Sequence, residues 1–210
     1  RKSFKRWGNC WECKGNNSMQ VKNELRKKYK EIRKNVENRN EKNTLINDFL
    51  CNSDCFKNCD TVLFYAALSD EVNLDFSIKY AIDNNKKVAL PVCIDNNGKM
   101  QYYYIDSLND IEIASFGVRE PDVNKCKEVD DFSKSICIVP AIAYDKFGYR
   151  LGYGKGYYDR FLSAYHGICI GVQYDELVCD KLFIDKYDVP VDYIITQNGV
   201  FSTKLGGKNG

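Results

Sequence analysis

The segment that constrains this chain most runs from an apolar strand through a glycine-rich turn into a helix. The apolar run Ile136–Val139 ends at Pro140 and is typical of a buried strand. After a polar stretch that holds Arg150, residues 152–156 read Gly-Tyr-Gly-Lys-Gly, and the residues that follow can continue as a helix. Glycines let backbone N–H groups approach an anion, the helix N-terminus adds favourable partial charge, and Arg150 and Lys155 supply two cations. The pattern therefore predicts a phosphate-binding turn.

The residue types and glycine spacing of this turn differ from those of two familiar phosphate-binding loops. A Walker loop carries Ser or Thr directly after its lysine, whereas Gly156 follows Lys155 here. A dinucleotide-binding fingerprint has Gly-x-Gly-x-x-Gly spacing, whereas these glycines alternate with single residues. A glycine turn that merely joins a strand to a helix, with its charges facing water, is the structural alternative.

The whole segment Pro140–Leu162, PAIAYDKFGYRLGYGKGYYDRFL, resembles the signature of the 5-formyltetrahydrofolate cyclo-ligase family, also called 5,10-methenyltetrahydrofolate synthetase. Shorter segments resemble other elements of that family and follow in the same order. They are Lys22–Arg26, Phe64–Val72, Val88–Pro91, Phe116–Pro121 and Asp188–Thr196. The resemblance runs from about Met19 to Thr196 and so implies one whole domain.

Strand patterns alternate with helix patterns along the chain. A first helix is predicted because Val21, Leu25, Ile32 and Val36 recur at helical spacing. Further helices are expected at Glu41–Cys59, Leu74–Asn84 and Gly156–Tyr165. Strands are expected at Thr61–Leu68, Lys87–Val92, Gln101–Ile105 (at an edge), Ser135–Pro140, Ile168–Tyr174 and Tyr193–Thr196. We therefore expect a single-domain, three-layer α/β sandwich with a mostly parallel, Rossmann-like sheet, whose ligands bind beyond the carboxyl ends of the strands.

We divide the chain into one folded domain and two ends. Residues 19–202 form the expected cyclo-ligase-like domain, and the glycine-rich residues 203–210 form a flexible tail. Residues 1–18 contain both tryptophans and are mostly basic where they are charged. We expect a flexible extension there, or the remnant of a targeting leader. The expected location is the cytoplasm, or an organelle if residues 1–18 are such a remnant.

Composition excludes several classes of protein. The net charge of +2 does not favour nucleic-acid binding, and no apolar run is long enough to cross a bilayer. The ten cysteines are scattered through expected strands and helices, so we expect reduced thiols without a bound metal. His166 is the only histidine, so a Ser-His-Asp hydrolase or a histidine-rich metal centre would have to be built around it. We expect a monomer that binds small molecules, with no nucleic-acid or membrane partner.

The resemblance implies a ligase that uses ATP to convert 5-formyltetrahydrofolate into 5,10-methenyltetrahydrofolate, with ADP and phosphate released, through a phosphorylated formyl intermediate. Phosphoryl transfer needs positioned charge more than a protein nucleophile, which suits a chain without a triad. The implied ATP-binding residues lie on the first helix and the glycine turn. They are Lys22, Arg26, Arg150, Leu151, Gly152, Tyr153, Gly154, Lys155, Gly156, Tyr157 and Tyr158. Lys155 and Arg150 are the implied catalytic residues, and Lys155 would stabilise charge on the transferring group.

The resemblance also implies a folate site and a magnesium site. Ala66, Glu71 and Tyr157 match positions that hold folate, and a carboxylate pairs well with the donor edge of a pterin ring. Asp159 and Asp188 match positions that bind Mg²⁺, a hard cation that bridges phosphates and carboxylates. Glu71 and Asp159 each have a structural alternative, in which the carboxylate simply stabilises the start of a helix by its charge. Asp188 can instead be a loop aspartate, and Tyr157 can simply pack its helix.

Four residues depart from the family pattern. Tyr153 stands where a basic residue is common, and Tyr187 stands where His is common. Leu177 and Phe183 replace a frequent Gln and Pro. These departures affect the expected substrate affinity and the wall of the C-terminal pocket. A paralogue without cyclo-ligase activity, active in thiamine or other cofactor metabolism, is one alternative, and a nucleotide- or nucleic-acid-binding module with basic and aromatic surfaces is another.

Overall fold

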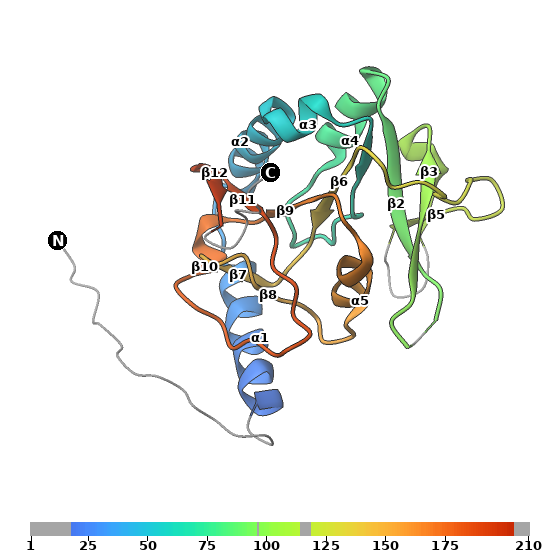
Figure 1. Ribbon diagram of the computed structural model, residues 1–210. Coiled ribbons are helices and arrows are strands. Elements are labelled where there is room, and N and C mark those ends of the chain that lie inside the picture. Colours follow the sequence, from blue (N-terminus) through green and yellow to red (C-terminus); the bar gives the residue numbers. More distant parts are fainter. Residues whose placement is uncertain (1–17, 96, 114–118, 204–210) are drawn as a thin grey trace.

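The computed structural model describes residues 18–203 except residues 96 and 114–118 (Figure 1). Its α-helices are α1 (Ser18–Lys34), α2 (Arg39–Asn52), α3 (Asp54–Asn58), α4 (Asp75–Asp83) and α5 (Tyr157–Ala164). The strands of the main sheet are β1 (Thr61–Leu63), β2 (Lys87–Cys93), β3 (Met100–Ile105), β6 (Ser135–Val139), β9 (Ile168–Val172), β11 (Tyr193–Thr196) and β12 (Gly199–Ser202). Two smaller sheets use β4 (Ile111–Ile113) with β5 (Arg119–Pro121), and β7 (Ala143–Asp145) with β8 (Arg150–Leu151) and β10 (Val178–Cys179).

The main sheet of the described residues is seven-stranded, in the order β12-β11-β9-β6-β1-β2-β3. Its inner strands pair in parallel, whereas β3 and β12 pair antiparallel at the two edges. The parallel strands lie in the order β2-β1-β6-β9-β11, so the direction of winding reverses between β1 and β6. In doubly wound α/β sheets, ligands bind in the crevice outside the carboxyl ends of the strands at this reversal. The expected mostly parallel sheet is confirmed.

Two apolar cores lie on opposite faces of the sheet. Along β6, Ile136 and Ile138 belong to one buried cluster, while Cys137 and Val139 belong to the other. The first cluster includes buried side chains of α1, α2 and α4, and the second includes Leu162 of α5. Because successive strand residues point to opposite faces, this alternation places a helical layer on each side (Figure 1). The three-layer expectation is confirmed.

Some expected element boundaries were wrong. The strand expected at Thr61–Leu68 ends at Leu63, and the following residues form a loop. The helix expected at Glu41–Cys59 is divided into α2 and α3 at Ser53, which has extended backbone and accepts a hydrogen bond from the N–H of Phe56. Ser53 therefore ends one helix and caps the next. The small sheet of β7, β8 and β10 was not predicted.

The described residues begin with α1 and end just after β12. Ser18 begins α1, and the hydroxyl of Thr203 donates to the carbonyl oxygen of Val191. The rest of the expected extension and tail, residues 1–17 and 204–210, lies outside the described part of the chain. No disulfide joins any two of the eight described cysteines. Among the described helices, none combines the length and the apolar character needed to cross a membrane.

Candidate active site

The glycine turn connects β8 to α5 through backbone that favours glycine. Gly154 has a φ of 96° and Gly156, the residue that precedes α5, has a φ of 73°. L-residues with a Cβ adopt such angles at a cost, whereas glycine does not. Gly156 therefore turns the chain into the helix and leaves the first N–H groups of α5 beside the turn. The predicted strand, turn and helix are all present, with the hairpin of β7 and β8 inserted between β6 and the turn.

Helix α1 holds the glycine turn in place through Arg26. The Arg26 Nε donates to the carbonyl oxygen of Gly152 at 2.8 Å. A Cβ on Gly154 would lie 3.1 Å from the Arg26 guanidinium, so the two groups are in close contact. The first helix and the glycine turn were predicted to lie on either side of the phosphates, and the structure brings them together.

Lys22 lies one turn before Arg26 and pairs with two carboxylates of the C-terminal loop. Its Nζ is 2.8 Å from an oxygen of Asp185 and 2.8 Å from an oxygen of Asp188, and its side chain is only 13% exposed. Burial alone would lower the pKa of Lys22, but hydrogen bonds and charge from Asp185 and Asp188 raise that pKa above its ordinary value. Lys22 and Asp188, predicted for ATP and metal respectively, are therefore direct neighbours. Asp185 was not predicted.

Arg150 is buried and joins two parts of the predicted site. Its side chain is 4% exposed, and its Nη2 lies 2.5 Å from Oδ1 of Asp159 on α5. Its Nη1 donates to the carbonyl oxygen of Val189 at 2.7 Å. One guanidinium thus holds α5 beside the loop that carries Asp188. In this arrangement Arg150 orients Asp159.

Lys155 differs from the other cations of the site. It is exposed at the tip of the turn, and within the described residues its amino group forms no ion pair or hydrogen bond. Its backbone carbonyl accepts a hydrogen bond from Arg160, which fixes the backbone of the turn. The ammonium group of Lys155 is therefore available to an anion on the turn.

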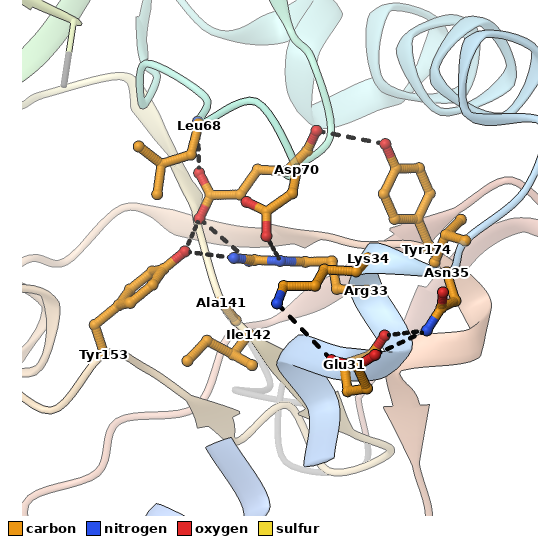
Figure 2. Close-up of polar contacts among 12 residues, drawn as sticks. Glu31, Arg33, Lys34, Asn35, Leu68, Asp70, Ala141, Ile142, Tyr153 and Tyr174 are labelled. Atoms are coloured by element: carbon orange, nitrogen blue, oxygen red, sulfur yellow. Dashed lines mark hydrogen bonds and ion pairs between the residues drawn. The ribbon is translucent and has the colours of Figure 1, made fainter. Parts of the chain in front are cut away.

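A buried carboxylate, Glu71, lies on the loop after β1, at the carboxyl end of the strand where the winding reverses. Its Oε2 accepts from the N–H of Leu68 at 3.0 Å, and its Oε1 accepts from the hydroxyl of Tyr153 at 2.7 Å. Arg33 of α1 approaches the same Oε1 at 3.5 Å and forms a shorter ion pair with Asp70, at 2.9 Å (Figure 2). Burial raises the pKa of Glu71, and these hydrogen bonds and the Arg33 charge offset part of that rise.

Sequence reasoning missed Arg33, which is 2% exposed and is among the largest buried side chains of the described residues. Its neighbour Ile32 belongs to the apolar repeat that predicted this helix, and that repeat gives no indication of a buried charge next to it. A usable signal existed, because Lys22, Arg26 and Arg33 are spaced by four and seven residues and so share one helix face. The face of α1 that carries Lys22 and Arg26 therefore also carries Arg33, which is buried.

The remaining predicted residues divide into core and surface positions. Leu151 is 3% exposed, and Tyr158 packs against the core cluster on the α5 side of the sheet. Ala66 packs against the other core and lies on the same loop as Glu71. The hydroxyl of Tyr157 donates to the carbonyl oxygen of Asp95 at 2.6 Å. The side chains of Leu151 and Tyr158 therefore anchor the glycine turn and α5 to the core. The side chain of Tyr157 instead reaches the turn between β2 and β3.

Among the hollows that the described residues border, one lies next to the glycine turn and a larger one lies away from it. One of about 260 Å³ is bordered by Tyr157, Arg160 and Lys99, next to the glycine turn. Another of about 600 Å³ is bordered by Lys86, Lys87 and other residues at the opposite end of β2, and it contains none of the predicted site residues. The site of interest is defined by the converging side chains of α1, the glycine turn and the β1 loop, and the larger hollow is separate from it.

Comparison with known proteins decides the family. Residues 18–197 match the 5-formyltetrahydrofolate cyclo-ligase family. This chain belongs to that family. The probable 5-formyltetrahydrofolate cyclo-ligase of Schizosaccharomyces pombe is 29% identical over 69% of this chain and 78% of its own length. The 5-formyltetrahydrofolate cyclo-ligase of Mycoplasma pneumoniae is 31% identical over 70% of this chain and 77% of its own length.

A solved structure gives the same assignment. The structure of Aquifex aeolicus 5,10-methenyltetrahydrofolate synthetase aligns with a TM-score of 0.77 and 30% identity, over 90% of this chain and 96% of that chain. The family's name is that of a ligase, and the resemblance inferred from the glycine turn is confirmed.

The four departures from the cyclo-ligase pattern have different environments. Tyr153 belongs to the network of Glu71 and Arg33, whereas Tyr187 is 72% exposed. Leu177 is fully buried in the core, and Phe183 is partly buried. Only Tyr153 among them contacts a side chain predicted to bind substrate.

The two carboxylates predicted to bind Mg²⁺, Asp159 and Asp188, lie on different elements, α5 and the C-terminal loop. Within the described residues, no group of three or more His, Cys, Asp or Glu side chains converges as a metal cage. Mg²⁺ bound with nucleotides commonly uses one or two carboxylates and takes its other ligands from phosphates and water. Asp159 and Asp188 are both partly exposed, and each is paired with a cation, Asp159 with Arg150 and Asp188 with Lys22. Their oxygen donors are of the type that such a Mg²⁺ ion uses.

Proposed function

We propose that this chain catalyses the ATP-dependent closure of 5-formyltetrahydrofolate to 5,10-methenyltetrahydrofolate. The formyl oxygen attacks the γ-phosphorus of ATP, and ADP departs. Nitrogen 10 of the folate then attacks the formyl carbon and loses its proton. Phosphate leaves with the former formyl oxygen, so the carbon remains as a methenyl bridge between nitrogens 5 and 10. Each atom is accounted for, and no protein nucleophile is required.

The observation that carries the proposal is the position of Lys155 in a cyclo-ligase family member. Its unpaired ammonium lies on a glycine turn that Arg26 holds against α1. The carboxylate of Glu71 lies across the same turn, bonded to Tyr153. A phosphate donor on the turn and a folate at Glu71 would therefore be neighbours, as phosphoryl transfer between them requires.

The other residues position charge. Lys22 and Arg26 bind the ATP phosphates from α1, and residues 150–158 enclose them from the other side. Asp159 and Asp188 would hold Mg²⁺, which when bound neutralises charge on the phosphate oxygens. Arg150 fixes Asp159. Ala66 and Tyr157 border the folate, and Lys155 stabilises the charge that develops on the transferring group.

An assay of the purified protein tests this function. With Mg-ATP and 5-formyltetrahydrofolate we expect growth of the methenyl absorbance and release of one ADP for each folate converted. Folded protein that shows no turnover would contradict the proposal and favour a family paralogue with another substrate.

The role of Lys155 has its own test. We expect Lys155→Ala to reduce kcat by about 10²–10³-fold, because one stabilising charge on the transferring group is lost. The matched control is Lys127→Ala, since Lys127 is 75% exposed and pairs only with Asp130 among the residues described. Wild-type kcat in the Lys155 variant would remove Lys155 from the mechanism.

A further inference from the structure

Tyr153 is the only residue of the glycine turn whose side chain reaches the buried carboxylate of Glu71, among the contacts of the described residues. Its hydroxyl donates to Glu71 Oε1 at 2.7 Å and accepts from Arg33 Nη2 at 2.8 Å (Figure 2). The ring lies under two cations of α1, with Lys30 Nζ at 5.1 Å and the Arg33 guanidinium carbon at 5.7 Å from its centroid. A single side chain thus links the turn, α1 and the β1 loop.

The backbone around Tyr153 makes this link sensitive to the position of the turn. Tyr153 is flanked by Gly152 and Gly154, and a Cβ on Gly152 would meet no atom within 4 Å. Gly152 itself therefore leaves open space beside the turn. The ties of the turn to α1 are the contacts of Arg26 with Gly152 and Gly154, together with the contacts of Tyr153. A shift of the turn would carry the hydroxyl of Tyr153 with it.

Glu71 depends on Tyr153 for its strongest side-chain hydrogen bond. Among the described side chains, the other group that approaches its Oε1 is Arg33, and that contact is longer, at 3.5 Å. The second oxygen is held by the N–H of Leu68. These bonds leave lone pairs of the carboxylate free, so the held orientation is compatible with a ligand that donates to it. Losing the hydroxyl would leave Glu71 less well oriented.

We infer that Tyr153 is a positioning residue that couples the nucleotide site to the folate site. Phosphate on the glycine turn fixes the turn in the position in which Tyr153 bonds Glu71, and the oriented carboxylate then binds folate more tightly. The same link works in reverse, because a coupling free energy between two sites is reciprocal. The inference rests on the proposed function, in which the glycine turn binds ATP and Glu71 binds folate.

Binding measurements test the coupling. The affinity for 5-formyltetrahydrofolate is measured by calorimetry with and without a non-hydrolysable ATP analogue and Mg²⁺. For the wild-type protein we expect the analogue to tighten folate binding at least about fivefold, the lower end of common couplings. In Tyr153→Phe, which keeps the ring and loses only the hydroxyl, we expect this ratio to fall to about one. The matched control Tyr80→Phe changes an exposed tyrosine of α4 and should keep the wild-type ratio.

The outcomes separate this inference from the proposed function. A wild-type ratio of one, or an unchanged ratio in Tyr153→Phe, overturns the coupling even if the enzyme turns over. Equal weakening of both ligands by Tyr153→Phe, with the ratio preserved, also overturns it, because that result describes a local contact. Absence of turnover, measured on the same wild-type preparation, counts against the proposed function. Even then, a coupling ratio that Tyr153→Phe abolishes would support the coupling between the two binding sites.

Discussion

At the scale of single residues, burial sets the chemistry of Glu71. Transfer of a carboxylate out of water disfavours its charge, while hydrogen bonds and a nearby cation favour it. Glu71 is 8% exposed and is bonded by Tyr153 and by the N–H of Leu68, with Arg33 close by. The balance leaves its pKa raised, with burial as the largest cause. A carboxylate oriented in this way can accept hydrogen bonds from a ligand.

The raised pKa of Glu71 predicts the pH dependence of stability. Below its ordinary pKa of 4.5, both the folded and unfolded states are protonated. As the pH rises through that value the unfolded state loses its proton first, so the unfolding free energy falls until the pH passes the raised pKa of the folded state. We expect the stability of wild type relative to Glu71→Gln to decline from pH 4 upward, then level off, in urea unfolding measured at several pH values. A difference that rises with pH would show that hydrogen bonds and Arg33 outweigh burial.

At the scale of elements, α1 and the glycine turn work as a pair. Lys22, Arg26 and Arg33 lie on one face of α1, and each contacts a loop that is distant in the sequence. The turn in return presents Gly154 to the Arg26 guanidinium and Tyr153 to Arg33. The packing of this helix therefore fixes where the turn lies.

The conformation of the turn gives a prediction with an internal control. Gly154→Ala places a Cβ at a φ of 96° and 3.1 Å from Arg26, so we expect it to lower the unfolding free energy by ~1–2 kcal/mol. Gly152→Ala meets no atom within 4 Å and has no positive φ, so its stability should change by no more than ~0.5 kcal/mol. Chemical denaturation of both variants measures this. Equal effects at the two positions would contradict the strained geometry of Gly154.

Many of the helices and strands could be predicted from the sequence, and the features that were missed have physical reasons. Helical spacing of apolar residues located α1, and short apolar runs located β2, β6 and β11, which are buried along most of their length. The break at Ser53 was missed because both sides of it read as helix, and only the capping bond to Phe56 separates them. Arg33 was missed because a buried charge has no periodic signature, and its partners Asp70 and Tyr153 are brought to it only by the fold.

At the scale of the whole molecule, the winding of the sheet explains why these residues meet. The strand order reverses between β1 and β6, which opens a crevice at their carboxyl ends. The loop of Glu71 follows β1, and the segment leading to the glycine turn follows β6. Helix α1 packs on one core and reaches both loops. Residues far apart in sequence thus converge because of topology.

That convergence predicts that ligands stabilise the entire domain. A nucleotide that binds only the folded state raises the unfolding free energy by about 2.7 kcal/mol at a hundred times its Kd. For a chain of this size, we expect Mg-ATP at that concentration to raise Tm by ~5–10 °C. Lys155→Ala should keep the Tm of the ligand-free wild type, because the exposed ammonium bonds no described residue, but should show a smaller rise with the same Mg-ATP concentration. A full wild-type rise in this variant would mean that nucleotide binding does not involve Lys155, and differential scanning fluorimetry of both proteins side by side decides between the two results.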